Sequence, residues 1–270
     1  MAAGGAGHHF RVLEAPLNLF ESGAFFQPNT GPGEKQTPLA LAAEAGIGIL
    51  VNRPLTAAAG NTVLRLVDFQ VIEESSEAPP DELLGHVAAL EDEYRTHIAS
   101  HLEAPPGGVS AADYFRWADQ LRTLPGQLHG VDHWLQIEEQ MITPMVAQVV
   151  HMLNLRLEGP LGHTWRSWRD RYLPALDALL SAFQNVAVRQ SQVNSDAVAS
   201  AIHPYLPLAC QGESLSRKAL WVLASTPGVS TVLLGMRHGS YVTDGMAILG
   251  WAPLANVGRI YEAVRQVRIA

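Results

Sequence analysis

The sequence predicts an α/β fold in which a few short strands flank a long helical segment. Two short apolar runs rich in β-branched residues, at residues 47–51 and 229–234, are typical of buried strands. Residues 67–212, between these runs, carry apolar side chains mostly at helical spacing. A helix is also predicted beside each strand, and this alternation of strands and helices is the pattern of the α/β class.

The first part of the chain predicts a strand, a helix and a second strand. Residues 10–19 are predicted to form the first strand. Thr37 is expected to cap a helix that begins with Pro38 and ends at Gly46. The apolar run at 47–51 is expected to be a parallel strand that is covered on both faces. This order predicts a right-handed strand-helix-strand unit.

The middle of the chain predicts a helical insertion with an acidic first helix. Between Asp68 and Glu103 there are ten acidic residues and one arginine, which gives that helix an acidic outer face. Helices are expected at residues 80–101, 110–122, 131–157, 165–188 and 195–202, with Ser110 as one cap and with breaks at 105–108, 125–126 and 159–162.

Two sets of large apolar residues in this insertion are expected to form its core. The helical spacing of the first set places it on one face, and the second set is interpreted as a packing cluster rather than a binding site. The first set is Trp134, Ile137, Met141, Met145, Val149 and Met152; the second is Trp165, Trp168 and Tyr172.

A turn near the C-terminus has the features of a phosphate-binding site. The strand at 229–234 is followed by Gly235, Met236 and Arg237, and Ser240 is expected to cap a helix over residues 241–250. Helix N-termini present free amides to anions, and an arginine side chain offers a planar set of donors to phosphate. The alternative is an ordinary strand-to-helix turn with a surface arginine.

Three stretches resemble consecutive units of the aldo/keto reductases. Residues 215–237 (LSRKALWVLASTPGVSTVLLGMR) resemble the last helix, strand and cofactor turn of that family. Residues 37–55 (TPLALAAEAGIGILVNRPL) are similar to its helix 6 and strand 7, and residues 10–21 resemble its strand 6. The resemblance implies a partial (β/α)8 barrel: strands 6 and 7 in residues 1–66, an insertion at 67–212, and the last helix, strand 8 and cofactor turn in 213–270.

The resemblance implies NADPH-linked reduction of a carbonyl or oxidation of an alcohol. The family's catalytic Asp, Tyr, Lys and His lie on the first four strands, and this chain begins at apparent strand 6. We therefore assign no catalytic residue and expect no turnover by this chain alone; His8 and His9 are poor substitutes in a leader. A truncated gene product, a half-barrel that pairs with another chain, and a non-catalytic protein with an acidic helical binding region are the open alternatives.

The resemblance assigns the adenosine end of NADP to the C-terminal turn. Gly235, Met236 and Arg237 match the turn that holds the 2′-phosphate, and arginine favours NADP over NAD because it compensates the additional phosphate. Tyr241 and Asp244 match helix positions that face this phosphate and adenine, whereas a glycine at the next position replaces the family's asparagine.

The resemblance assigns the nicotinamide end to residues on the first two strands. Glu14 matches a glutamine that binds the carboxamide, although a carboxylate accepts hydrogen bonds and donates none. Asn52 takes the place of an aromatic residue that stacks on the nicotinamide ring. Asn18 is expected at the top of the barrel or in an exposed turn, and Arg53 is a weaker candidate for the pyrophosphate. Glu14 has an alternative role as partner of a nearby arginine.

Composition restricts the compartment and the partners. The net charge of −8 argues against nucleic acid, and the absence of an apolar run of about 20 residues argues against a membrane span. Cys210 is the single cysteine, which suits a reducing compartment, and we expect a cytoplasmic protein. His129 and His133 have the spacing of a half metal site, but without the glutamate of a zinc peptidase no metal is expected. Open sheet edges are expected to favour a partner chain or self-association.

Overall fold

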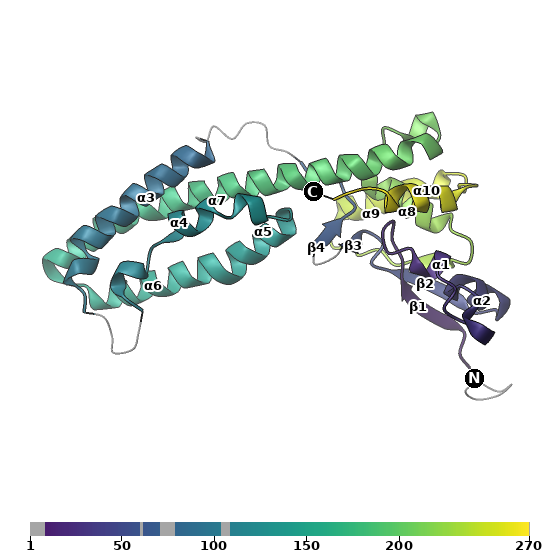
Figure 1. Cartoon of the computed structure of the whole chain (residues 1–270), viewed down its shortest axis with the longest axis horizontal. Helices are drawn as coiled ribbons and strands as arrows, with labels where there is room; N and C mark the ends of the chain where they lie inside the picture. Colours follow the sequence, from purple (N-terminus) through teal and green to yellow (C-terminus); the bar gives the residue numbers. More distant parts are fainter. Residues whose placement is uncertain (1–8, 60–61, 71–78, 104–108, 270) are drawn as a thin grey trace. The chain divides into compact units, whose positions relative to one another are not determined.

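The computed structural model describes residues 9–59, 62–70, 79–103 and 109–269. The chain divides into two compact units, which are described separately: unit 1 comprises Met1–Asp68 and Gln192–Ala270, and unit 2 comprises Phe69–Ser191. Figure 1 labels the helices and strands. The predicted α/β class is confirmed, since unit 1 contains two small sheets with their helices and the described part of unit 2 is helical.

Unit 1 is built on a parallel sheet with the strand order β1-β2-β5. β1 (Val12–Pro16) pairs with β2 (Gly48–Asn52) over their whole lengths, from Val12 opposite Gly48 to Pro16 opposite Asn52. β5 (Thr231–Val232) is much shorter than its predicted six residues, although amides on either side of it also bond to carbonyls of β2. The carboxyl ends of all three strands therefore lie at one edge of the sheet.

One face of this sheet is buried and the other is partly open. Ile49 and Val51 of β2 are buried, whereas Leu50 between them is only half-buried. The expectation that this strand is covered on both faces is therefore wrong within the described residues. Leu17, Val222 and Tyr261 are among the buried side chains of the same core as Ile49 and Val51.

Two helices next to the sheet begin with a side-chain cap, one of which the sequence predicts. Thr37 accepts a hydrogen bond from the amide of Ala40 at the start of α2 (Pro38–Glu44), which confirms the predicted cap. Ser214 accepts from the amide of Arg217 at the start of α8 (Leu215–Ala224). Gly228 has a φ of +89°, and a Cβ there would lie 3.2 Å from the Leu39 carbonyl oxygen, so α2 approaches the chain before β5 too closely for a larger residue.

Unit 1 also contains a β-hairpin that is not among the predicted elements. β3 (Thr56–Ala59) and β4 (Thr62–Arg65) pair in the antiparallel direction, with Thr56 opposite Arg65. The remaining elements of unit 1 are α1 (Gly23–Phe26), η2 (Pro32–Glu34), η7 (His203–Tyr205), η8 (Leu208–Cys210), α9 (Gly239–Met246), η9 (Ala247–Gly250) and α10 (Val257–Arg265).

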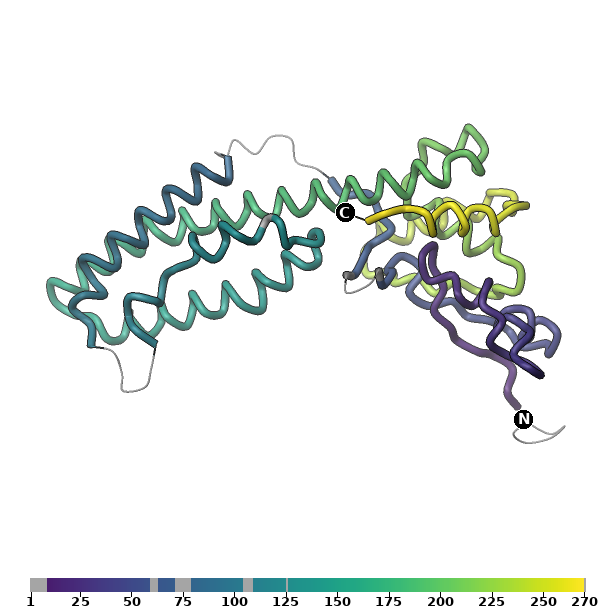
Figure 2. The backbone as a smooth tube through the Cα atoms, viewed as in Figure 1, coloured from purple at the N-terminus to yellow at the C-terminus, as the bar shows by residue number. Residues whose placement is uncertain are grey.

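Unit 2 is a set of helices, and its chain can be followed in Figure 2. α6 and α7 are joined by two residues and form an antiparallel hairpin. The elements are α3 (Pro80–His97), η3 (Ala99–His101), η4 (Ala111–Asp113), α4 (Trp117–Arg122), η5 (Pro125–Gln127), α5 (Val131–Ile137), η6 (Glu138–Ile142), α6 (Thr143–Arg156) and the first part of α7 (Gly159–Ile202).

Aromatic side chains fill the core of unit 2, as predicted for Trp165, Trp168 and Tyr172. The planes of Trp168 and Tyr172 stack at 4.5 Å, and Phe115 and Tyr94 pack against Trp168 at 4.9 Å each. The Trp168 indole nitrogen donates to the Leu90 carbonyl over 2.7 Å. Edge-to-face and stacked rings of this kind stabilise a core beyond the area that they bury.

The predicted core face of α6 is displaced by one residue. Met141 and Met145 were expected inside but are 55% and 53% exposed, whereas Ile142 and Val146 are buried. The cause is η6, a π-helical turn, which adds one residue relative to an α-helical turn. Further along α6, Leu153 is fully buried, the predicted Met152 is half-buried, and Val149 and Val150 both pack against the core from half-buried positions.

The two predicted helices at 165–188 and 195–202 are one helix, α7. The predicted break at 159–162 is instead its start, because proline is tolerated in a first helical turn. A Cβ on Gly162 would lie 2.7 Å from the Leu157 carbonyl oxygen, so glycine allows this tight start. Pro174 lies within α7 without ending it. From Gln192 onward the helix belongs to unit 1.

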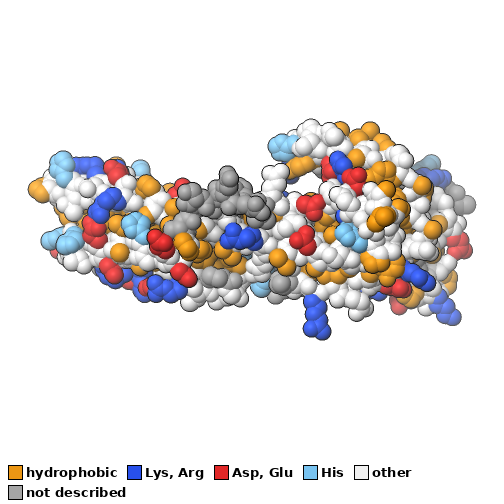
Figure 3. Space-filling model, turned by 90° about the horizontal axis from the view of Figure 1, so that it is seen from above, with side chains coloured by type: hydrophobic (Ala, Val, Ile, Leu, Met, Phe, Trp, Pro, Cys, Tyr) orange, Lys and Arg blue, Asp and Glu red, His pale blue; other side chains and the backbone are white. Residues whose placement is uncertain are grey.

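Three smaller predictions have different outcomes. Ser110 does cap, but it caps the short η4 rather than a helix that reaches Arg122. The break predicted at 105–108 lies outside the described residues. Cys210 is free and half-buried. On the face of the molecule seen in Figure 3, acidic and basic side chains are interspersed with hydrophobic ones.

Candidate nucleotide-binding site

The chain forms an exposed turn directly after β5. The Leu233 amide donates to the Val51 carbonyl over 2.8 Å, and the next backbone bond is donated by Tyr241 to His238 over 3.0 Å. Between these two bonds, the amides of residues 234–240 donate no hydrogen bond to the described part of the chain. Free amides in series at the carboxyl end of a strand are suited to hold an anion.

Arg237 is the charged side chain of this turn. It is exposed, and among the described residues it has no ion pair or hydrogen bond to another side chain. Gly235 and Gly239 have no positive φ, and a Cβ on either would meet nothing within 4 Å. These glycines are therefore not required by packing, and their open surroundings leave the backbone accessible.

The helix after the turn begins two residues earlier than predicted. His238, rather than Ser240, is the residue before α9, and its side chain makes no capping hydrogen bond. The rings of His238 and Tyr241 pack edge to face at 5.2 Å. Met236 and Tyr241 are 46% and 49% exposed, so both side chains are accessible to a ligand.

Asp244 is bound within the protein. Its carboxylate accepts from the Arg217 Nε over 2.7 Å and from the Ser214 and Ser216 hydroxyls. Arg217 also pairs with Glu213 over 2.7 Å. This network ties α9 to α8, and it neutralises a carboxylate that would otherwise repel an anion at the turn.

Gly245, where the resemblance implied an asparagine, lies against the end of β5. A Cβ at this position would lie 2.5 Å from the Leu234 Cδ2 atom. α9 therefore lies so close to the end of β5 that Leu234 would have to move before a larger residue fitted.

Glu14 and Asn52 are brought together on neighbouring strands. The Asn52 Nδ2 donates to the Glu14 Oε1 over 2.7 Å, so Glu14 is paired with an amide rather than with the arginine considered from the sequence. The Asn52 Oδ1 is buried and has no hydrogen-bond partner among the described residues. An acceptor in this state costs free energy unless a donor reaches it.

Asn18 and Arg53 have structural roles. Asn18 is fully buried; its Oδ1 accepts from the amides of Phe20 and Glu21, and its Nδ2 donates to Glu21 and to the Thr56 carbonyl. Arg53 adopts a positive φ of 51° and pairs with Glu21 over 2.9 Å. It is therefore not available to a pyrophosphate unless this pair breaks.

The sequence analysis missed a buried pair of titratable groups in unit 1. Lys218 is 4% exposed, and its Nζ lies 3.1 Å from the Nε2 of His203. Burial lowers the pKa of Lys218, while Asp68 and Glu213 act in the opposite direction. Burial and then the charge of Lys218 lower the pKa of His203. Lys218 follows Ser216 and Arg217 at the polar start of α8, so the sequence carries no clear signal for its burial.

The pair of histidines with the spacing of a half metal site belongs to no larger group of metal ligands in the described residues. His129 and His133 stack at 5.3 Å, and no group of three or more metal-ligating side chains occurs among the described residues. In the same part of the chain, no helix has both the length and the apolar character to cross a bilayer.

Comparison with protein-family models, curated proteins and solved structures gave no match.

Proposed function

We propose that unit 1 binds NADP, with the 2′-phosphate at the turn of Gly235, Met236 and Arg237. The sheet is interpreted as part of a reductase-type barrel of the aldo/keto reductase kind, with β1, β2 and β5 as its last three strands. Their parallel order and their shared carboxyl edge support this interpretation. In an α/β sheet, that edge is where ligands bind.

The observation that carries the proposal is the exposed Arg237 beside a series of amides without partners. A guanidinium group forms charge-assisted hydrogen bonds to a phosphate, and backbone amides without partners can add further donors. Tyr241 offers an exposed aromatic face one turn later, which suits stacking against adenine. The network of Asp244 holds α9 in place without leaving a free negative charge.

The fit at the other end of the cofactor depends on Asn52 and Glu14. A carboxamide group has two N–H donors, and two acceptors are close together here: the Asn52 Oδ1 at the end of β2 and the Glu14 carboxylate in the middle of β1. The Glu14 carboxylate can accept from a ligand amide directly, whereas the buried Asn52 Oδ1 can do so only after neighbouring groups move aside. Bound NADPH would supply a hydride, but none of the described residues is assigned to proton transfer.

Titration with NADPH and NADH tests the proposal directly. Intrinsic fluorescence or calorimetry is expected to show saturable binding of NADPH and weaker binding of NADH, because only NADPH carries the 2′-phosphate. Arg237→Ala is expected to weaken NADPH binding about tenfold, which corresponds to roughly 1.4 kcal/mol. No oxidation of NADPH with added aldehydes or ketones is expected from the chain alone.

Arg259→Ala is the matched control, because Arg259 is also exposed and belongs to unit 1. It is expected to leave both affinities unchanged. The proposal is rejected if NADPH does not bind at millimolar concentration, or if Arg237→Ala and Arg259→Ala have equal effects. Asn52→Ala is expected to weaken NADPH less than Arg237→Ala and to leave 2′-phospho-ADP-ribose binding unchanged.

A second candidate is an interaction protein that associates through the free edge of β1. β1 pairs on one side only among the described residues, and Val12 and Leu13 are 48% and 38% exposed. Exposed apolar edge strands pair with strands of other chains. Val12→Lys is expected to abolish association in light scattering, whereas Val63→Lys, at an exposed valine of β4, is expected to have no effect. A monomeric wild type excludes self-association.

A further inference from the structure

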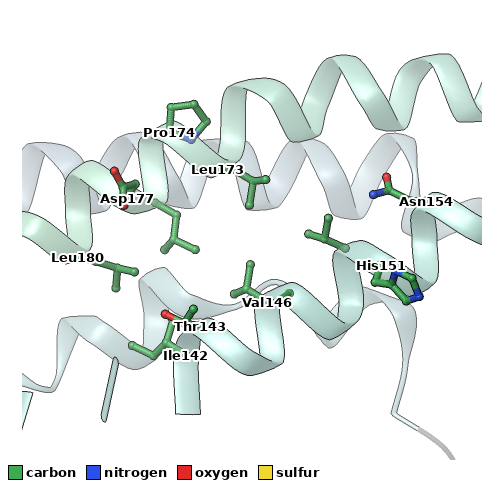
Figure 4. A pocket seen from close by; sticks show the side chains of 12 residues that line it. Ile142, Thr143, Val146, His151, Asn154, Leu173, Pro174, Asp177 and Leu180 are labelled. Atoms are coloured by element: carbon green, nitrogen blue, oxygen red, sulfur yellow. The ribbon is translucent and has the colours of Figure 1, made fainter. Parts of the chain in front are cut away.

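A cavity between α6 and α7 in unit 2 has two apolar walls. Its volume is about 720 Å³, within the range of roughly 300–1,000 Å³ that is typical of small-molecule sites. Ile142, Val146 and Val150 line one wall, and Leu173, Leu176 and Leu180 line the other. Figure 4 shows these two faces opposite each other.

Irregular backbone borders this cavity on both sides. The π-helical turn η6 ends at Ile142, on the α6 side, and Pro174 interrupts the hydrogen bonding of α7 on the other. Proline removes a backbone donor and bends a helix, and π-helical turns are frequent at functional sites. The cavity is therefore associated with two specific deviations from regular helix geometry.

The two ends of the cavity differ in their polar groups. Thr143 and Asp177 lie at one end, and His151 and Asn154 lie at the other (Figure 4). The Oδ1 of Asn154 accepts from Trp165 and from Arg169, so that oxygen is already satisfied. Asp177 has no ion pair with a described Lys or Arg.

A second carboxylate, Glu138, does not line the cavity but interacts electrostatically with Asp177. Glu138 precedes Ile142 by four residues, and it has no ion pair within the described residues. Burial raises the pKa of Glu138, and the negative charges of Asp177 and Glu139 raise it further. The two carboxylates therefore repel each other at this end, and a cation placed there relieves that repulsion.

We propose that the α6–α7 cavity binds a small amphiphilic amine, with its hydrocarbon chain between the apolar walls and its ammonium group at Asp177. Thr143 and His151 are eight residues apart on α6, which corresponds to about 12 Å of helix and accommodates a medium-length alkyl chain. The apolar walls provide the affinity, and the carboxylate end selects the cation. This site belongs to unit 2 and is independent of the NADP proposal.

Octylammonium, octanol and octanoate are suitable probes, because they share one hydrocarbon chain and differ in the charge of the head group. Calorimetry on the full chain, at monomeric probe concentrations, is expected to give a Kd on the order of 0.1 mM for octylammonium. Octanol is expected to bind more weakly, and octanoate is expected not to bind. Equal binding of octanol and octylammonium would overturn the assignment of an amine.

Two pairs of variants locate the site. Ala147→Phe introduces a ring at an exposed lining position and is expected to weaken octylammonium binding more than tenfold; Gln148→Phe introduces the same ring at the next residue, which does not line the cavity. Asp177→Asn is expected to weaken octylammonium roughly fivefold and to leave octanol unchanged, in line with a partly exposed charge pair. Asp81→Asn is its control in the same unit.

Each variant is checked for correct folding, so that a folding defect is not mistaken for a loss of binding. Circular dichroism verifies that each variant retains its helical content, and Asp177→Asn serves as the test if Ala147→Phe does not fold. Unchanged affinity in both Ala147→Phe and Asp177→Asn, or equal effects of each variant and its control, would show that octylammonium binds elsewhere. Loss of binding in Ala147→Phe alone, with no effect of Asp177→Asn, would refute the role of the carboxylate.

Discussion

Glu91 is a buried carboxylate whose removal should strongly destabilise unit 2. It is 2% exposed, and its Oε1 accepts from the Trp117 amide over 2.8 Å, from the Ala118 amide over 3.3 Å and from the Tyr172 hydroxyl over 3.0 Å. Two of these donors are the first amides of α4, which have no partners inside their own helix. The carboxylate therefore caps α4 and anchors the aromatic core at the same time.

The expected change in the free energy of unfolding for Glu91→Ala follows from these contacts. Three buried donors lose their acceptor, at about 1–3 kcal/mol each, and the desolvation cost of the carboxylate is recovered in return. We expect a net loss of about 3–5 kcal/mol in the free energy of unfolding. Glu91→Gln retains an oxygen for all three donors and is expected to cost about 1 kcal/mol, similar to Tyr172→Phe, which removes a single hydroxyl.

The pH dependence gives a second test of the same contacts. Burial raises the pKa of Glu91, against the opposing hydrogen bonds from Tyr172, Ala118 and Trp117. The folded state then binds the proton more tightly than the unfolded state, so this contribution is fully present below the unfolded pKa of about 4.5 and decreases as the pH rises through the folded pKa. The cost of Glu91→Gln is therefore expected to be smaller at pH 7 than at pH 4.5.

Urea unfolding followed by tryptophan fluorescence and near-UV circular dichroism measures these differences. The m-value verifies that each variant unfolds from a comparable state. A decrease of less than about 1 kcal/mol in the free energy of unfolding for Glu91→Ala would refute the reasoning, because three buried donors without an acceptor should cost more than that. A cost of Glu91→Gln that grows with pH would show that the sign of the linkage is wrong.

Three further predictions concern stability. Because the pKa of His203 is lowered in the folded state, the neutral imidazole stabilises the fold above the unfolded pKa of about 6.5, and this stabilisation is lost as the pH falls through the folded pKa. His203→Gln keeps an acceptor for Lys218 but does not titrate, so the free energy of unfolding should vary less with pH between these two pKa values, as measured by urea unfolding. Gly228→Ala should cost about 1–3 kcal/mol in urea unfolding, because alanine is strained at a φ of +89° and meets a backbone oxygen at 3.2 Å; an unchanged midpoint would contradict this. Met145→Lys should be tolerated within about 0.5 kcal/mol and Val146→Lys should cost more than about 3 kcal/mol in thermal unfolding, and the reverse order would reject the register set by the π-helical turn.

The sequence predicted the parts of the fold in which local signals agree with one another. Thr37 and Pro38 mark the start of α2, and the β-branched run of β2 stands next to it, so both were found. The packing role of Trp168 was also predictable, because its neighbours in the cluster recur at helical spacing. In each case the pattern depends only on residues that are close in the sequence.

The remaining features depend on contacts that the sequence pattern does not contain. The π-helical turn at Glu138–Ile142 moved the buried face from Met145 to Val146, and no residue type signals such a turn. At the candidate site, Arg237 is exposed, which fits both a phosphate-binding turn and an ordinary surface arginine, and Asp244 is occupied by Arg217 from another helix. Pairings of this kind are tertiary, and spacing along the chain does not reveal them.

Asn18 has a consequence for any molecule that meets the carboxyl edge of the sheet. Its amide links the segment after β1 to the segment after β2, so that the rim is already fixed before a ligand arrives. A preorganised rim loses little conformational entropy on association, and more of the contact energy then appears as affinity. Aspartate cannot replace it, because an ionised carboxylate would face the carbonyls of Arg53 and Thr56 without a proton to share.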